Sequence, residues 1–105
     1  EEALGTVTIH LSVLTTVARL TSLATPGVAR MSDEWRLNVG ECWVTRDGAV
    51  TIDLYVVAEP DANLLHLGQA LQKEVRRAIE EMVGVEVMGV NVFIQDVDFP
   101  LLRSE

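Results

Sequence analysis

The stretch WVTRDGAVTIDLYVVA, residues 43–58, decides the fold that this 105-residue sequence predicts. Two runs rich in β-branched and aromatic residues flank the dipeptide Asp47-Gly48, which is the pair that a two-residue type I′ hairpin turn favours. The stretch therefore predicts a β-hairpin whose second arm points Ile52, Leu54 and Val56 into the core. A two-residue turn also sets the register, in which Arg46 pairs with Ala49, Trp43 with Ile52, and Cys42 with Asp53.

A strand and a helix are predicted before the hairpin. Thr6–His10 alternates between polar and apolar residues, which indicates a strand with Val7 and Ile9 pointing inward. The helix begins at Ser12, whose hydroxyl can accept a hydrogen bond from the first turn, and it ends at Pro26-Gly27. We expect its core-facing stripe to consist of Val13, Val17, Leu20 and Ala24, widened by Leu14 and Ala18. The stretch from Arg30 to Asn38 is predicted to be a loop that carries Trp35 as an interface anchor.

A second helix and a last strand are predicted after the hairpin. Glu59-Pro60-Asp61 interrupts the strand, and either Asp61 or Asn63 can cap the helix, which ends at Gly84. Its apolar stripe is expected to be Leu64, Leu67, Leu71, Val75, Ala78 and Met82. The last strand directs Val90, Val92 and Ile94 inward by the same alternation.

The order of these elements is β-α-β-β-α-β, which is typical of a split βαβ fold in the α+β class. We predict one four-stranded mixed sheet with both helices on a single face. The other face should be polar if the protein acts alone, but the alternation places apolar residues there. These residues and their polar surroundings are the predicted partner-binding site, namely Val44, Thr51, Tyr55, Val57, Asn91 and Phe93. Scattered surface hydrophobic residues are common, and this is the competing interpretation.

The composition excludes several classes of protein. The length suits one domain, and 16 acidic against 8 basic residues give a net charge of −8, which disfavours nucleic-acid binding through phosphates. The single cysteine, Cys42, excludes an internal disulfide and favours the reducing cytosol. No apolar run approaches the roughly 20 residues of a membrane span, and Glu1-Glu2 does not resemble the start of a secretory signal. We therefore expect no direct membrane insertion.

No catalytic, metal or cofactor site is predicted. The two histidines, His10 and His66, fall in different elements without converging carboxylates. The predicted register sets Cys42 opposite Asp53, whose negative charge disfavours a reactive thiolate. Other charged residues are interpreted as solvated surface, namely the basic cluster Lys73, Arg76 and Arg77 and the loose carboxylates Glu80, Glu81, Asp96 and Asp98.

Several stretches resemble the alkaline shock protein family of envelope stress response proteins, in the expected order. They are Gly5–Ile9, Val17-Ala18, Pro26–Ala29, Asp47–Val57, Leu71–Ile79, Gly84-Val85 and Val90–Val97. The most specific are VTIDLYVV, residues 50–57, and VNVFIQDV, residues 90–97. The resemblance implies a single domain of this family over residues 1–105, with its core at about 5–100.

The resemblance also implies a non-enzymatic cytoplasmic protein linked to envelope or alkaline stress. Some members of the family self-associate and are held beneath the membrane by a separate membrane-anchoring partner, so a homo-oligomer and such a partner are expected here. The family has no catalytic motif to carry over. Two alternatives stay open: a small-ligand sensor with a cleft between sheet and helices, and an RNA-binding module that stacks bases on Tyr55 and Phe93.

Overall fold

A computed structural model of the chain describes residues 4–6, 9–32, 42–44 and 49–99. Two helices and four strands lie within them, in an α-β-β-β-α-β order. They are α1 (Leu11–Ala24), β1 (Val28–Met31), β2 (Cys42–Val44), β3 (Val50–Ala58), α3 (Leu64–Met82) and β4 (Val87–Val97). The predicted α+β class with two helices and a mixed sheet is confirmed.

The sheet is built around β3 and is three strands wide. β4 runs parallel to β3 along its whole length, whereas β1 and β2 are antiparallel to it. β1 pairs with residues 56–58 of β3 and β2 with residues 50–52, so both share the edge of β3 that β4 leaves free. The prediction of four strands side by side is therefore wrong.

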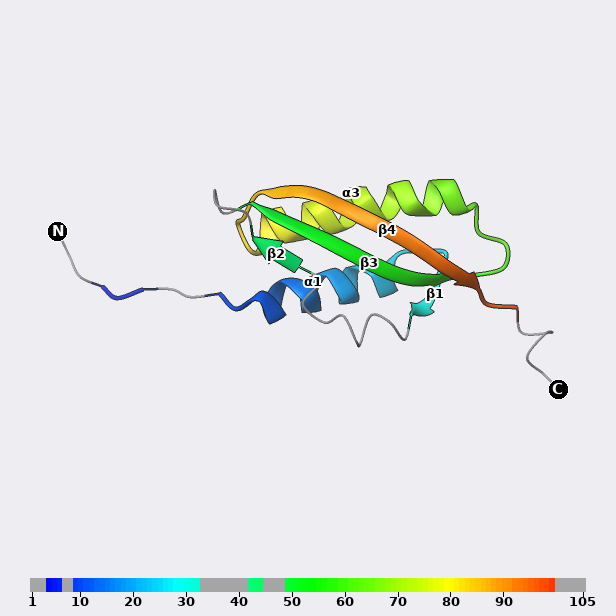
Figure 1. Cartoon of the computed structure of the whole chain (residues 1–105), viewed down its shortest axis with the longest axis horizontal. Coiled ribbons are helices and arrows are strands. Elements are labelled where there is room, and N and C mark those ends of the chain that lie inside the picture. The colour runs from blue at the N-terminus through cyan, green and yellow to red at the C-terminus, as the bar shows by residue number, and fades with distance from the viewer. Residues whose placement is uncertain (1–3, 7–8, 33–41, 45–48, 100–105) are drawn as a thin grey trace.

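The strand predicted before α1 is not formed by the described residues, and a strand that follows α1 in the sequence takes its place in the sheet. Residues 4–6 and 9–10 form no strand, Ile9 is exposed, and this N-terminal segment points away from the sheet (Figure 1). Val7 lies outside the described residues. β1 instead follows a reversal at Gly27, which adopts a φ of 103° and accepts a hydrogen bond from the Glu59 backbone at 2.8 Å. The alternation of Thr6–His10 indicates an extended segment, but it does not specify which strand will pair with it.

The hairpin register differs from the predicted one by one residue. Val44 pairs with Val50, so Trp43 pairs with Thr51 rather than Ile52, and Cys42 with Ile52 rather than Asp53. Five residues (45–49) lie between the paired Val44 and Val50, whereas the predicted register would place six between Val44 and Thr51. Asp47-Gly48 itself lies outside the described residues. The prediction that Val44 lies on the outer face depended on the predicted register.

The core lies between one face of the sheet and both helices. Val50, Ile52, Leu54, Val56 and Ala58 of β3 are buried there, as the alternation predicted for the middle three. α3 contributes residues at strict four-residue steps, Leu67, Leu71, Val75 and Ile79. α1 contributes Leu14 and Ala18 to the same cluster, which confirms that both helices lie on one face.

The predicted stripe of α3 is partly correct. Asn63 caps the helix, because its side-chain oxygen accepts a hydrogen bond from the His66 backbone at 3.0 Å. Leu64 and Met82, at the two ends of the predicted stripe, are exposed instead of buried. Ile79, which the prediction omitted, is fully buried because it continues the four-residue steps.

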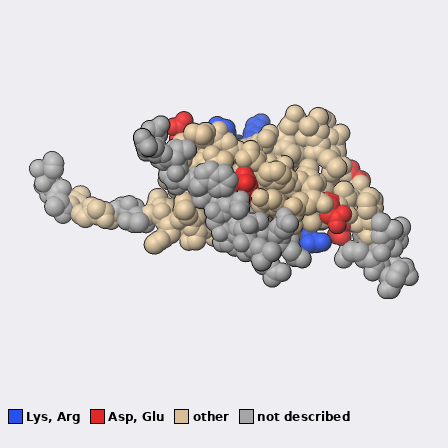
Figure 2. All heavy atoms as spheres, in the orientation of Figure 1, with Lys and Arg blue, Asp and Glu red and all other residues tan. Residues whose placement is uncertain are grey.

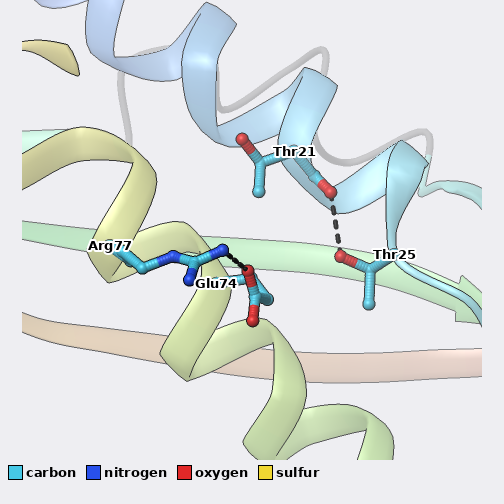
Figure 3. A network of polar contacts seen from close by, with 4 residues as sticks. All are labelled: Thr21, Thr25, Glu74 and Arg77. Carbon is cyan, nitrogen blue, oxygen red and sulfur yellow. Dashed lines mark hydrogen bonds and ion pairs between the residues drawn. The ribbon is translucent and has the colours of Figure 1, made fainter. Parts of the chain in front are cut away.

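The predicted stripe of α1 is partly correct. Leu14 and Ala18 are buried and Val17 packs against the core. The helix is nevertheless rotated so that Val13, Leu20 and Ala24 face outward. Its buried residues are Leu14, Thr15, Ala18 and Ser22. The hydroxyls on this inner side bond to carbonyl oxygens of the preceding turn, Thr15 to Ser12 at 3.0 Å and Ser22 to Ala18 at 2.7 Å. Figure 3 shows the same bond from Thr25 to Thr21 at 2.9 Å. Because α1 satisfies these hydroxyls itself, they can be buried without a cost in lost hydrogen bonds. The cap position is His10 rather than the predicted Ser12.

Candidate functional site

The candidate site is the face of the sheet opposite the two described helices. The parallel register of β3 and β4 places Asp53 beside Asn91 and Tyr55 beside Phe93 on this face. It therefore consists of two rows of side chains, Thr51, Asp53, Tyr55 and Val57 from β3 and Asn91, Phe93 and Gln95 from β4.

The centre of the site is an aromatic pair. The rings of Tyr55 and Phe93 are stacked, with centroids 5.1 Å apart and planes inclined by 14°. Tyr55 is half-buried and packs against the edge of the core, whereas Phe93 is 44% exposed. Stacking on Tyr55 holds the Phe93 ring in one place, so a partner could cover it with little loss of side-chain freedom.

Polar contacts flank the aromatic pair on both sides. On one side, the Asn91 side chain donates a hydrogen bond to the buried carboxylate of Asp53 at 2.8 Å. On the other side, the Ser32 hydroxyl, just after β1, donates to Gln95 at 2.6 Å. An apolar centre with a hydrogen-bonded border is the usual composition of a protein interface.

Four of the six predicted site residues remain candidates. Thr51 and Tyr55 are half-buried on this face, and Asn91 and Phe93 are exposed on it. Val57 lies in the same row but is only 3% exposed, so it supports the face and cannot contribute contact area. Val44 pairs with Val50, and its side chain lies outside what the structure describes.

The histidines and the cysteine were the residues weighed as metal ligands or nucleophiles. The described residues contain no cluster of three or more histidine, cysteine, aspartate or glutamate residues that could hold a metal ion. His10 precedes α1 and His66 lies exposed in the first turn of α3. Cys42 has Ile52 and not Asp53 as its strand partner, so the predicted charge effect on its thiol loses its basis.

The predicted basic cluster is part of a mixed-charge surface on α3. Arg77 forms an exposed salt bridge with Glu74 at 3.0 Å (Figure 3), and Arg76 donates to the backbone carbonyl of Met88 at 3.5 Å. In the space-filling view of Figure 2, the coloured acidic and basic residues are scattered, and most described atoms between them belong to other residues. The charge on this side is therefore not gathered into one patch among the described residues.

Several grooves lie on the surface of the helix layer, including one at the junction of the two helices and one between α3 and the edge strand of the sheet. The larger, about 450 Å³, lies where α1 ends and α3 begins, and its lining includes Pro26, Asp61 and His66. The smaller, about 290 Å³, lies between the first half of α3 and β4, and its lining is Leu64, Leu65, Gly68, Gln69, Gln72, Val92 and Ile94. Sequence patterns did not indicate the second groove, because it depends on how α3 crosses the edge of the sheet.

The sequence of nearly the whole chain carries a family signature. Residues 1–99 match the alkaline shock protein 23 family, which is described as having a cell envelope-related function. The chain belongs to this family. The resemblance seen in the sequence is thereby confirmed, and the family is not known as a family of enzymes.

The other comparisons add little to this assignment. No curated protein and no solved structure is significantly similar to the chain. Neither helix in the described part of this alkaline shock protein has the length and apolarity needed to cross a bilayer.

Proposed function

We propose that this alkaline shock protein is a non-enzymatic scaffold or partner-binding module of the envelope stress response. It acts in the cytoplasm near the membrane through the sheet face centred on Tyr55 and Phe93. Its expected occupants are other copies of the chain and a membrane-anchoring protein. Family membership supports the envelope-related part of this proposal, and the scaffold role is inferred from the surface.

The observation that carries the proposal is the exposed half of the stacked ring pair. Phe93 leaves 44% of its surface in water although its ring is already fixed against Tyr55. Aromatic anchors of this kind supply much of the binding energy in protein interfaces, since covering them removes a large apolar area from water. Thr51 and Asn91 border the pair and can provide hydrogen bonds that orient a partner.

The same geometry disfavours the two alternatives. An RNA-binding sheet presents free aromatic faces to bases, whereas one face of each ring here is used in the contact with the other ring. The net charge of −8 also opposes phosphate. A small-ligand sensor that binds between sheet and helices is disfavoured because buried side chains fill that interior, and the groove between α3 and β4 is open to the surface.

The test is to change Phe93→Asp and measure mass by light scattering and binding by affinity capture from membrane fractions. We expect a folded protein that forms smaller assemblies and no longer retains a membrane protein that the unmodified chain captures. Leu23→Asp is the matched control, because Leu23 is 42% exposed on α1 and receives the same charge. If Phe93→Asp leaves both mass and capture unchanged, or Leu23→Asp alone disperses the assemblies, the sheet face is not the interface.

A further inference from the structure

The free edge of β4 is the feature that the proposed function leaves unexplained. The backbone N–H of Val50 donates to Glu86 and that of Asp98 donates to the Ala58 carbonyl, whereas Ser32 donates to the Tyr55 carbonyl. The backbone N–H and C=O groups of the even-numbered residues of β3 therefore point toward β4, and those of the odd-numbered residues point toward β1. In the parallel register Ile52 lies opposite Val90 and Leu54 opposite Val92. Since a residue in a parallel pair bonds to the neighbours of its opposite residue, the peptide groups of Val90, Val92 and Ile94 point out of the sheet.

Side chains of α3 cover only the first part of this edge. Gln72 donates to the Val90 carbonyl at 3.2 Å, and Arg76 donates to the Met88 carbonyl at 3.5 Å. Within the described chain, no residue forms a hydrogen bond with the outward peptide groups of Val92 and Ile94. Unpaired backbone groups on an edge strand are a template for pairing with another strand.

The open part of the edge is bordered by an apolar groove. The groove of about 290 Å³ between α3 and β4 is lined by Leu64, Leu65 and Gly68 beside Val92 and Ile94. Leu65 is 70% exposed, which is unusual for a leucine in a helix that packs on a sheet. A Cβ on Gly68 would meet no atom within 4 Å, so packing inside this chain does not require a glycine there. The missing side chain instead leaves room beside the edge.

The composition of the edge favours a second copy of the chain as its occupant. Sixteen residues of the chain are acidic and eight are basic, but residues 87–95 of β4 include neither charge nor proline. Edge strands are normally protected from self-pairing by lysine, proline or inward charges. Where residues 91–95 of two copies meet, the contact contains no charge, although each copy carries −8.

We infer that β4 is a strand-pairing edge at which two copies of the chain join antiparallel about a two-fold axis at Phe93. Val92 then pairs with Ile94 of the partner subunit, and Ile94 with Val92 of the partner subunit. The two sheets become continuous, and Leu64 and Leu65 close over the joint from the helix side. Such an interface is closed by its symmetry, so it produces a dimer. This inference goes beyond the proposed function, which concerns the face of the sheet.

The test is Gly68→Glu, which places a charge in the groove without removing any contact. Glycine is unfavourable in a helix interior, so the variant is expected to fold at least as well as the unmodified chain. We expect the mass measured by light scattering to fall about twofold, from two chains to one. Met82→Glu is the control, because it adds the same charge at an exposed residue at the far end of α3 and should leave the dimer intact.

Hydrogen exchange distinguishes the edge from the face. In the unmodified chain the amides of Val92 and Ile94 should become protected as protein concentration rises, and in Gly68→Glu they should exchange rapidly at every concentration. Assemblies in which these two amides stay unprotected would overturn the strand-pairing inference and leave the sheet-face proposal standing. A dimer that survives Gly68→Glu with both amides protected would show that the groove is not part of the joint and would overturn the inference as stated.

Discussion

The two helices lie on the same face of the sheet but pack against it in opposite ways. α3 turns its most apolar side inward, and Leu67, Leu71, Val75 and Ile79 fill the core. α1 turns Leu14, Ala18 and two hydroxyl residues inward and leaves Val13, Leu20 and Leu23 exposed. The spacing of apolar residues therefore predicts the buried side of a helix reliably only when the polar residues of the helix must stay in contact with water. Hydroxyls that bond to their own helix do not need it.

The two helices also differ in the size of the side chains that they bury. Ala18 and Ser22 are both fully buried, and they lie on the side of α1 that meets α3 and the sheet. Small side chains at a helix contact let the two backbones come near each other, because interaxial distance depends on the side chains between them. At the corresponding contact, α3 packs a layer of leucine, valine and isoleucine against the sheet.

The largest expected effect is the loss of a core side chain from α3. Leu71→Ala should lower the free energy of unfolding by about 2–5 kcal/mol, because Leu71 is fully buried and its removal leaves a cavity. Leu20→Ala removes the same atoms from a residue of α1 that is 54% exposed. This change should alter the free energy of unfolding by less than about 1 kcal/mol. Urea denaturation of both variants gives the comparison. Equal losses would mean that α1 does not present Leu20 to solvent.

An intermediate effect is expected when the inner side of α1 is enlarged. Ala18→Leu should destabilise the fold by about 1–3 kcal/mol, because the fully buried Ala18 has no space for a larger side chain. Ala24→Leu makes the same change on the exposed side and should be within about 0.5 kcal/mol of neutral. The check is the midpoint of chemical unfolding for each variant. A stabilising Ala18→Leu would show that α1 is loosely packed.

The smallest expected effect concerns the N-cap residue, which directly precedes each helix. Asn63→Ala removes the bond to the His66 backbone and should cost about 1 kcal/mol. His10→Ala should have almost no effect, because the His10 side chain makes no capping bond to α1. His10→Asp should stabilise the protein by up to about 1 kcal/mol by supplying that bond. Thermal unfolding curves of the three variants test this order, and a loss for His10→Ala as large as for Asn63→Ala would contradict it.

The sequence predicted those parts of the fold that depend on short-range patterns. The alternation of β3, the four-residue steps that place Leu67, Leu71 and Val75 in the core, and the cap at Asn63 are local properties of the chain. The position of the ring pair could also be predicted, because the alternation along two strands placed Tyr55 and Phe93 on one face. The register of β2 could not be predicted in this way, because it differs by one residue from the pairing that a regular two-residue turn sets.

Features that depend on distant partners escaped prediction. Two segments, Thr6–His10 and Val28–Met31, could compete for the edge of β3, and the reversal at Gly27 brings only the second beside it. The rotation of α1 depended on whether Thr15 and Ser22 could satisfy their hydroxyls while buried. The open edge at Val92 and Ile94 depended on where Gln72 and Arg76 of α3 reach β4.

The amino-acid sequence by itself determined the family, the α+β class, the inward side of β3 and the absence of a charge along residues 87–95. These follow from residue types at fixed spacing, which local geometry translates directly into faces. Only the tertiary structure decided which segment completes the sheet, which side of α1 is buried and which backbone groups of β4 remain open. Those outcomes are settled by competition among distant segments for hydrogen bonds and buried area, and a pattern within one segment contains no information about its competitors.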